Sequence, residues 1–277
     1  MSASREPPSS LERNPAALAL LLALTPLPAF AAALPTTCAP TIEVTGVPVT
    51  RVEKNGVLVL VDGRAVHLEG LLLPQGAKDH APAFLAEQAV STLSDLSRGR
   101  TVSLAVNIPK EDRYGRLRAQ VEFPQDNDEP WLQIAMLRRG LARVDIAPDR
   151  RECALALYAA EAEARRNKNG IWTQPAYAIR NPDQLAGTAG TFQIVEGKVL
   201  TANVKNGRAY LDFGTDWGRD FTATISSDDM PIFRDAGVDP RNYAGKTVRV
   251  RGYVDALGGA PAIAASSPDS FEVLVGQ

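Results

Sequence analysis

The residues that could do chemistry in this sequence gather around one short run, Asp112-Arg-Tyr-Gly-Arg116. Its two guanidinium groups can each hold phosphate oxygens through paired hydrogen bonds, and its tyrosine ring can stack on a planar base. A second polar pair, His67 and Glu69, falls on one face of an expected strand and has the residue types needed for proton transfer. We therefore expect an anion-binding site near Arg116, with the His67 side chain close to it.

Each of these residues also has a simpler structural explanation. A hairpin arginine is often a solvated turn residue, which is the alternative for Arg113, and a tyrosine at a strand end is often a packing residue, which is the alternative for Tyr114. His67 and Glu69 can be a solvated pair without any role in proton transfer. The residues that flank Arg116 favour phosphate binding at that position, with Arg113 and Tyr114 as further nucleic-acid contacts.

The composition excludes several other kinds of site. The 277 residues include two histidines, His67 and His80, and two cysteines, Cys38 and Cys153, whose spacing fits no zinc-ligand pattern. The net charge of −2 excludes a generally basic nucleic-acid-binding protein, so any such binding needs a local patch. Residues 37–180 contain 19 Lys/Arg and 18 Asp/Glu, whereas residues 181–277 contain 9 and 12, so only the first part supports such a patch.

The elements that must position the Arg116 run form a β-rich α+β pattern. Alternating apolar residues predict strands within residues 43–124, and Asp62-Gly63 is typical of a hairpin turn. Apolar residues three or four apart predict a helix from Pro82 to Gly99 between the third and fourth strands. Two further helices are expected at residues 130–140 and 149–168. This order predicts a helix-capped, OB-type five-stranded barrel.

A polar, turn-rich linker at residues 181–190 separates this part from a second set of strands. Strands are predicted at residues 192–200, 209–213, 221–225, 246–253, 261–264 and 271–274, with a short helix at residues 228–236. This pattern favours a second, smaller OB-like barrel over residues 191–277. Most of its aromatic residues are expected in the core, and Trp217 is the best candidate for an exposed ring that stacks on a single-stranded base.

The first 33 residues have the pattern of a secretory signal peptide. Arg5 and Arg13 precede a short apolar run at residues 16–24, and small residues surround Ala31 and Ala33, where cleavage is expected. The run is too short to span a bilayer, so the mature chain is predicted to have no transmembrane segment and to be periplasmic or secreted. An uncleaved apolar anchor is the alternative.

Export would place the two cysteines in an oxidising compartment. We therefore predict a disulfide between Cys38 and Cys153, with two unpaired thiols as the alternative.

Three stretches together resemble the thermonuclease, or staphylococcal-nuclease-like, family over about residues 46–173. They are the Asp112–Arg116 run, the segment Val66-His-Leu-Glu-Gly-Leu-Leu-Leu-Pro74, and the pair Arg139-Gly-Leu-Ala142 and Asn169-Gly-Ile-Trp172. The segments 210–214 and 216–221 look like the OB-like C-terminal module of some exported members. The resemblance implies hydrolysis of DNA or RNA by two arginines, a glutamate and an aspartate-bound calcium ion.

The sequence departs from this family pattern at most of the site positions. The second family arginine falls on Arg116, but the first falls on His67 and the glutamate falls on Gln75. The metal-binding turn falls on Lys54-Asn-Gly56 and the remaining aspartate on Leu72, so the expected metal positions, Gly56 and Leu72, carry no carboxylate. Gln75 cannot accept a proton from water, and histidine lacks the two-pronged guanidinium geometry. We therefore expect no calcium cofactor and a degenerate catalytic site.

Three functional hypotheses follow. The first is an exported nuclease-like protein that binds single-stranded nucleic acid, a nucleotide or an envelope partner without calcium-dependent catalysis. The second is a phosphodiesterase with an altered, metal-independent site formed by His67, Glu69 and Arg116. The third is a structural module that binds another envelope protein. Enzymatic activity is expected to be weak or absent.

Overall fold

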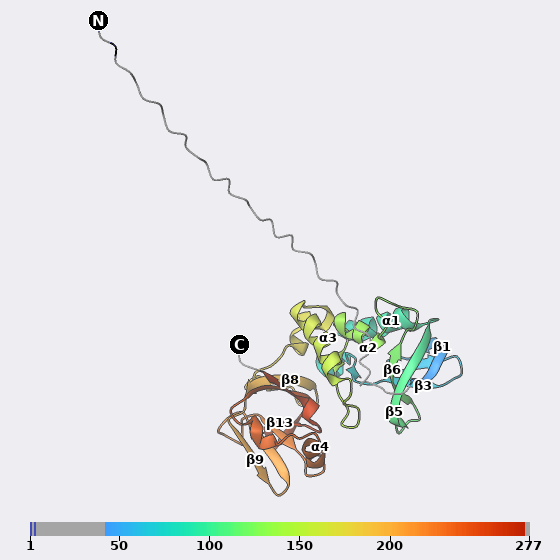
Figure 1. Ribbon diagram of the computed structural model, residues 1–277. Helices are drawn as coiled ribbons and strands as arrows, with labels where there is room; N and C mark the ends of the chain where they lie inside the picture. Colours follow the sequence, from blue (N-terminus) through green and yellow to red (C-terminus); the bar gives the residue numbers. More distant parts are fainter. Residues whose placement is uncertain (2, 4–41, 275–277) are drawn as a thin grey trace. The chain divides into compact units, whose positions relative to one another are not determined.

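The computed structural model describes residues 1, 3 and 42–274, and Figure 1 traces their path. Its first sheet is a closed barrel with the strand order β1-β2-β3-β6-β5. These strands are β1 (Ile42–Val52), β2 (Leu58–Leu60), β3 (Ala65–Leu68), β5 (Thr101–Glu111) and β6 (Leu117–Glu122). The predicted helix-capped five-stranded barrel is therefore confirmed. We call residues 42–173 the barrel module.

Alternating apolar side chains fill this barrel, as the sequence pattern requires. Leu58, Leu60, Val66, Leu104 and Val121 are each 0–1% exposed and belong to one continuous core. Their burial removes apolar surface from water, which is the main force that favours the closed sheet. β3 runs parallel to β6 while the other barrel pairs are antiparallel, and this pairing closes the ring.

Three helices pack around the barrel, at α1 (Ala83–Ser97), α2 (Leu132–Arg138) and α3 (Ala154–Arg166). α1 buries Leu85, Ala89 and Leu93, which follow the predicted three- or four-residue spacing. The backbone at Gly140, after α2, lies against the backbone at Asn169, after α3. A Cβ added to Gly140 would lie only 2.1 Å from the carbonyl oxygen of Asn169. Glycine is needed at this contact. Short elements complete the module: β4 (Leu71–Leu72), β7 (Arg143–Val144), and the 3₁₀ helices η1 (Gly76–Asp79), η2 (Gly170–Thr173) and, just after it, η3 (Pro175–Tyr177).

Residues 192–274, which we call the sheet module, form one seven-stranded sheet with a second core. The strand order is β14-β12-β13-β11-β10-β9, and β8 also pairs with β12. The strands are β8 (Phe192–Lys198), β9 (Thr201–Lys205), β10 (Arg208–Asp212), β11 (Thr222–Ile225), β12 (Thr247–Leu257), β13 (Ala260–Ala264) and β14 (Phe271–Leu274). Three short helices, α4 (Met230–Asp235), η4 (Pro240–Tyr243) and η5 (Pro268–Ser270), lie between them.

The strands of this module differ from the predicted ones mainly at β9. The strand predicted at residues 192–200 is confirmed as β8, which ends two residues earlier, at Lys198, and a separate strand, β9, begins at Thr201. The sequence analysis missed β9 because its residues are mostly exposed and therefore lack an apolar alternation. The described strand pairs do not close a ring, so the second OB-like barrel stays a prediction.

A buried ion pair and a buried arginine hydrogen bond to a backbone carbonyl join the two modules. Arg251 of β12 donates to the carboxylate of Glu161 in α3, with both nitrogen–oxygen distances at 3.1 Å. Arg143 of β7 donates to Asp79 and to the carbonyl oxygen of Phe192 in β8. The described residues 42–274 belong to one compact unit, and the division into domains at 46–173 and 191–277 stays a prediction.

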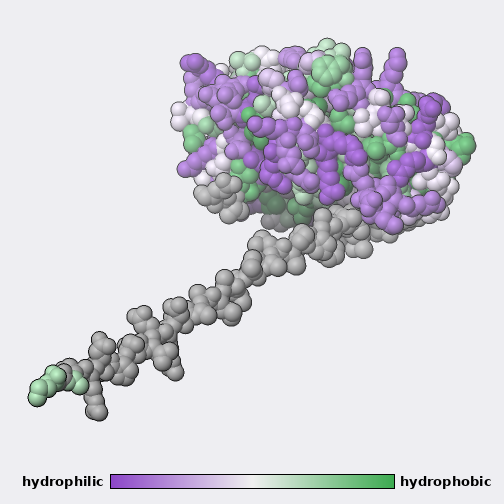
Figure 2. Space-filling view, turned by 90° about the horizontal axis from the view of Figure 1, so that it is seen from above, coloured by the Kyte–Doolittle hydropathy of each residue, from purple (hydrophilic) through white to green (hydrophobic). Residues whose placement is uncertain are grey.

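The face of the molecule seen in Figure 2 is largely hydrophilic, with apolar residues in small scattered groups. Within the described residues, no helix is both long and apolar enough to cross a membrane. The predicted signal peptide at residues 1–33 and Cys38 fall in the part of the chain that the structure does not describe, apart from residues 1 and 3.

Candidate functional site

A pocket of about 420 Å³ opens beside the β1–β2 turn of the barrel module. The turn residues 54–56, His67 of β3, Leu72 of β4 and Gln75 line it together, although they are far apart in the sequence. Lys78 of η1 and two residues of α1 complete the wall. We call this hollow the barrel pocket. It brings together four of the five positions at which the family resemblance places functional groups.

The turn at residues 54–56 owes its shape to local hydrogen bonds. The backbone N–H of Gly56 donates to the carbonyl of Glu53, and the Asn55 side chain accepts from the N–H of Val57. Gly56 has φ of +82°, a conformation that favours glycine. An aspartate at Gly56 would therefore strain the backbone, so the missing carboxylate agrees with the local conformation of the turn.

The barrel pocket does not fit a calcium ion. Its lining contains two ammonium groups, Lys54 and Lys78, and no carboxylate. Calcium needs six to eight oxygen ligands and is repelled by ammonium groups. Among the described residues no cluster of three His, Cys, Asp or Glu side chains could hold a metal ion.

Asp79, which follows the lining residue Lys78, is committed to other partners. Arg143 donates to both of its oxygens at 2.9 Å, the Tyr177 hydroxyl donates at 2.9 Å, and the Gln75 backbone N–H donates at 2.8 Å. Asp79 is only 4% exposed. Its role is to hold η1 against the rest of the protein.

The resemblance places the first family arginine at His67, and the imidazole does not supply the same charge. Its side chain is about two-fifths exposed. Burial lowers the pKa of His67, and although Glu69 opposes this effect, the positive charge of Arg116 adds to it. The imidazole is therefore neutral at pH 7.

Glu69 is not available as a partner for proton transfer. Arg118 donates to both Glu69 oxygens, at 2.9 and 3.1 Å, whereas the His67 Nε2 lies 3.8 Å from Oε1. Arg118 also holds Asp149 through two hydrogen bonds, and these bonds lower the pKa of Asp149. Arg118 was not among the candidate site residues singled out from the sequence. The contact follows from the parallel pairing of β3 with β6, which places Arg118 beside His67 and near Glu69.

The Arg116 hairpin, residues 111–117, lies outside the pocket lining but acts on His67 through its charge. The Nε of Arg116 donates to Asp112 at 2.7 Å, and the Asp112 carboxylate also accepts the backbone N–H groups of Tyr114 and Arg116. Burial raises the pKa of Asp112, but these hydrogen bonds outweigh burial and lower it. The carboxylate therefore stays ionised and fixes both the turn and the guanidinium.

Tyr114 forms the exposed tip of this hairpin. Its side chain is 69% exposed, so the packing explanation does not apply. The guanidinium carbons of Arg116 and Arg113 lie 4.9 and 5.4 Å from the centre of its ring. The hairpin thus presents one exposed aromatic face together with two cations, an arrangement suited to a base and its phosphate.

Gln75 has a partner that the sequence analysis missed. Its side-chain amide donates to the hydroxyl of Tyr253 in β12, with a nitrogen–oxygen distance of 3.4 Å. An amide has no basic site for a proton, so Gln75 can orient a water molecule but cannot activate one as a base.

The remaining candidates have structural positions. His80 is exposed in the turn that ends η1. Cys153 is 3% exposed at the start of α3. Because Cys38 lies outside the described residues, the disulfide between them stays a prediction.

Comparison with known proteins agrees with this geometry. Residues 66–174 match the model of the family described as staphylococcal nuclease homologue. None of the curated proteins matches the chain. The match begins at Val66 in β3 and ends just after η2, so it includes His67, Gln75 and the Arg116 hairpin. Residues 66–174 match this family and fold with β1 and β2 into a closed five-stranded barrel with helices, so the chain contains a staphylococcal-nuclease-like domain.

Proposed function

We propose that the barrel module binds single-stranded nucleic acid or nucleotides and does not cleave them in a calcium-dependent reaction. The observation that carries this proposal is the barrel pocket, which has two lysines and no carboxylate in its lining, beside a hairpin that keeps Arg116 and Tyr114. The first feature argues against the metal-dependent reaction, and the second favours binding of an aromatic anion.

The chemistry of phosphodiester hydrolysis explains why catalysis is not expected. The reaction needs a base to activate water and positive charge to stabilise the phosphoryl oxygens in the transition state. Gln75 supplies no base, and neutral His67 supplies no charge at pH 7. Each missing electrostatic group typically lowers the rate by about 100–1,000-fold, so the losses together would leave little activity.

Binding of a phosphate-containing ligand needs neither a general base nor a metal ion. The guanidinium of Arg116 is held on one side by its hydrogen bond to Asp112. Lys54 and Lys78 are exposed at the rim of the pocket. Phosphate oxygens can contact these cations without a metal ion, while Tyr114 stacks on a base.

The direct test is a nuclease assay on the purified chain with denatured DNA and with RNA, in calcium and in chelator. We expect no calcium-dependent cleavage. Robust cleavage that both the chelator and Arg116→Ala abolish would overturn the proposal.

A binding assay tests the positive half of the proposal. Fluorescence anisotropy with labelled decathymidylate should give a Kd that rises about tenfold or more in Arg116→Ala, because a charge-assisted contact is lost. Arg64→Ala is the matched control, because Arg64 also binds an aspartate, Asp62, in an exposed hairpin of the same barrel. Equal losses in both variants would contradict a specific role for the Arg116 hairpin.

A metal-independent phosphodiesterase built on His67, Glu69 and Arg116 is the weaker hypothesis, since Arg118 already occupies the Glu69 carboxylate. Metal-independent cleavage that falls in His67→Ala would support it. Recovery of an envelope protein by the chain, without any nucleic-acid binding, would support the purely structural hypothesis instead.

Export and the disulfide complete the proposal. A charged start, a short apolar run and small residues at the expected cleavage site support export of the chain from residue 32 or 34 on. Mass spectrometry of the protein from an oxidising compartment should show the shortened N-terminus and a gain of two hydrogens on reduction. An intact N-terminus, or no mass change on reduction, would contradict the corresponding part.

A further inference from the structure

A second hollow, of about 390 Å³, lies on the outer face of the sheet module. We call it the outer-face hollow. Its size is in the range of small-molecule sites in proteins. Three adjacent strands, the end of β12 and two loops contribute its lining, which consists of Asn203, Lys205, Tyr210, Asp212, Trp217, Thr222, Leu257 and Gly258.

The strand register places the polar groups of this hollow side by side. Tyr210 of β10 is opposite Asn203 of β9, and Asp212 is opposite Thr222 of β11. Alternate residues on β10, Ala209 and Leu211, point to the other side and are 0–1% exposed in the core. The floor of the hollow is therefore a fixed grid of an amide, a phenol, a carboxylate and a hydroxyl.

Trp217 stands over this floor from a loop that its own hydrogen bonds hold in shape. The indole side chain is 79% exposed. Asp216 and Asp220 close the loop, because the Asp216 N–H donates to the Asp220 carboxylate at 2.8 Å and the Asp220 N–H donates to the Asp216 carbonyl at 2.7 Å. The loop also packs tightly, since a Cβ added to Gly214 would lie 2.0 Å from the Asp220 carboxylate.

An exposed indole on an ordered loop is unusual unless something covers it. Burying a tryptophan ring against a ligand removes a large apolar area from water, and a fixed loop loses little entropy when the ligand binds. Leu257 is only partly exposed at the edge of the same hollow and adds a second apolar contact.

The charges of the hollow favour a neutral ligand. Lys205 and Asp212 are the only ionisable side chains of opposite sign in the lining, and they balance each other. The surrounding residues 181–277 contain 9 Lys/Arg and 12 Asp/Glu, a net charge of −3, which opposes a polyanion. Asp212 already accepts the hydroxyl groups of Thr201 at 2.8 Å and Thr222 at 3.1 Å, and a carboxylate has further lone pairs for the hydroxyl groups of a ligand.

We propose that the outer-face hollow binds a neutral saccharide. The flat C–H face of a sugar ring would lie on the Trp217 indole, and its hydroxyl groups would bond to Asp212, Asn203 and Tyr210. This proposal concerns the sheet module and does not depend on the function proposed for the barrel module.

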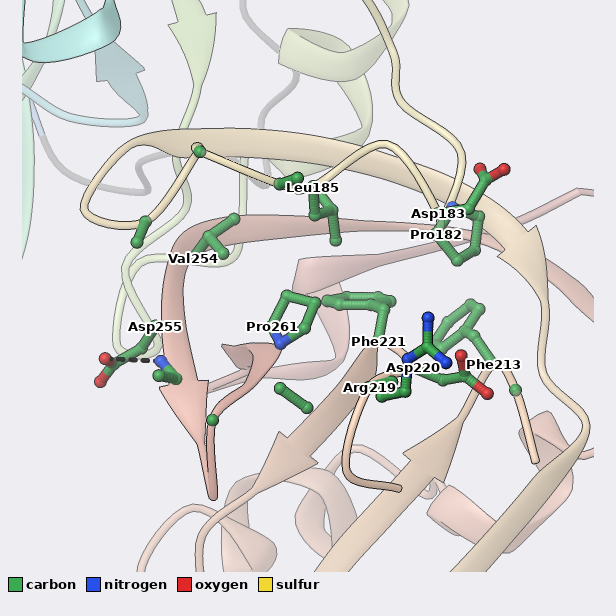
Figure 3. A pocket seen from close by; sticks show the side chains of 17 residues that line it. Pro182, Asp183, Leu185, Phe213, Arg219, Asp220, Phe221, Val254, Asp255 and Pro261 are labelled. Atoms are coloured by element: carbon green, nitrogen blue, oxygen red, sulfur yellow. Dashed lines mark hydrogen bonds between the residues drawn. The ribbon is translucent and has the colours of Figure 1, made fainter. Parts of the chain in front are cut away.

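A neighbouring hollow, which Figure 3 shows, lacks this combination. Asp220 and Arg219 of the Trp217 loop also border it, but its aromatic rings, Phe213 and Phe221, are buried in the core. It contains three aspartates and one arginine in its lining and no exposed ring, so it offers no stacking surface for a sugar.

The experiment is calorimetric titration of the purified chain with cellohexaose, maltohexaose and chitohexaose, with decathymidylate as the anionic comparison. At least one hexasaccharide should bind, and its Kd should rise at least about tenfold in Trp217→Ala, as expected for the loss of an aromatic anchor. Trp217→Phe should keep most of the affinity. The control is Phe84→Ala, because Phe84 is 55% exposed on α1, away from the hollow.

Three outcomes would overturn the proposal. They are no binding of any hexasaccharide at millimolar concentration, saccharide binding that is unchanged in Trp217→Ala, and decathymidylate binding that Trp217→Ala removes while no saccharide binds. The last outcome would assign the hollow to nucleic acid. Circular dichroism of each variant verifies folding, which an exposed indole should not affect.

Discussion

The barrel pocket and the outer-face hollow have nearly the same volume, about 420 and 390 Å³, but opposite chemical character. The barrel pocket has two lysines, a neutral histidine and several leucines in its lining, and an exposed arginine hairpin lies beside it. The outer-face hollow balances one lysine against one aspartate beneath an exposed indole. A few polar side chains, not the size of the hollow, determine which ligands each can accept.

The difference also shows how a site changes when its fold is kept. The closed barrel still brings residues 54–56, His67 and Gln75 together, because the core residues that hold the strands are intact. The side chains that face the pocket are not needed for the core, so they can lose carboxylates without loss of the fold. The pocket lining has two lysines and no carboxylate, which is the basis of the proposed binding without calcium.

The largest predicted effect tests whether the two regions are one folding unit. Arg251→Ala should lower the free energy of unfolding by about 3–5 kcal/mol, because it leaves the buried Glu161 carboxylate with one arginine partner fewer. Urea denaturation followed by circular dichroism measures this loss.

Arg249→Ala is the control for this prediction, because Arg249 lies on the same strand, β12, as Arg251. It pairs with Glu196 of β8 with about a quarter of its side chain exposed. Its loss should be about 1 kcal/mol or less. Equal, small losses in both variants would mean that the modules are held together by other contacts.

The second prediction concerns salt and separates the two hollows directly. Raising the salt from about 50 to 200 mM should weaken decathymidylate binding by about 10–20-fold if three phosphates are neutralised, since counterion release sets the slope. Saccharide binding at the outer-face hollow should be almost unchanged, because no net charge is neutralised there. Equal salt dependence of the two affinities would contradict the difference in charge between the two hollows.

The sequence alone predicted the barrel and most of the residues that meet at its pocket. The strands and helices of the barrel module have clear apolar periodicity, and the resemblance aligned Lys54–Gly56, His67 and Gln75 on one site. The contact between Arg118 and Glu69 was not predicted, because it depends on the parallel pairing of β3 with β6. Tyr253 was missed for a similar reason, since nothing local in the sequence relates it to Gln75.

The sheet module was harder to predict. β9 exposes nearly all its side chains, so it has no alternating pattern, and the outer-face hollow depends on the register of this strand with β10. Only Trp217 was identified beforehand, as an exposed ring; its neighbours Asn203 and Asp212 became visible through cross-strand pairing.

A third, smaller effect concerns the pH dependence of the barrel pocket. Because burial lowers the pKa of His67, the imidazole gains its proton only below its ordinary value of 6.5. Decathymidylate affinity should therefore rise by about two- to fivefold as the pH falls below this point, since one cation is added near the phosphate. His67→Gln should abolish this rise.

The free energy of unfolding should fall with pH over the same interval in which the affinity for decathymidylate rises. Between the lowered pKa of His67 and 6.5 the unfolded chain binds more protons than the folded one, so stability falls as the pH falls through this interval. NMR titration of His67, assigned by the His67→Gln variant, measures the pKa directly. A midpoint above 6.5 would contradict the neutral imidazole on which the lost catalytic charge depends.

The smallest predicted effect is that of calcium, which should be none in the wild-type chain. A ligand that binds only the folded state raises its stability by RT ln(1 + [L]/Kd), so a calcium site would raise the melting temperature when calcium replaces chelator. With Lys54 and Leu72 at the barrel pocket and no carboxylate in its lining, we expect no shift. The double variant Lys54→Asp, Leu72→Asp places two carboxylates there and should show a small positive shift. If calcium raises the melting temperature of the wild-type chain and the double variant shows no larger rise, calcium binds elsewhere. If Gln75→Ala removes the rise seen in the wild-type chain, calcium binds in the barrel pocket and the expected absence of a metal site there is wrong.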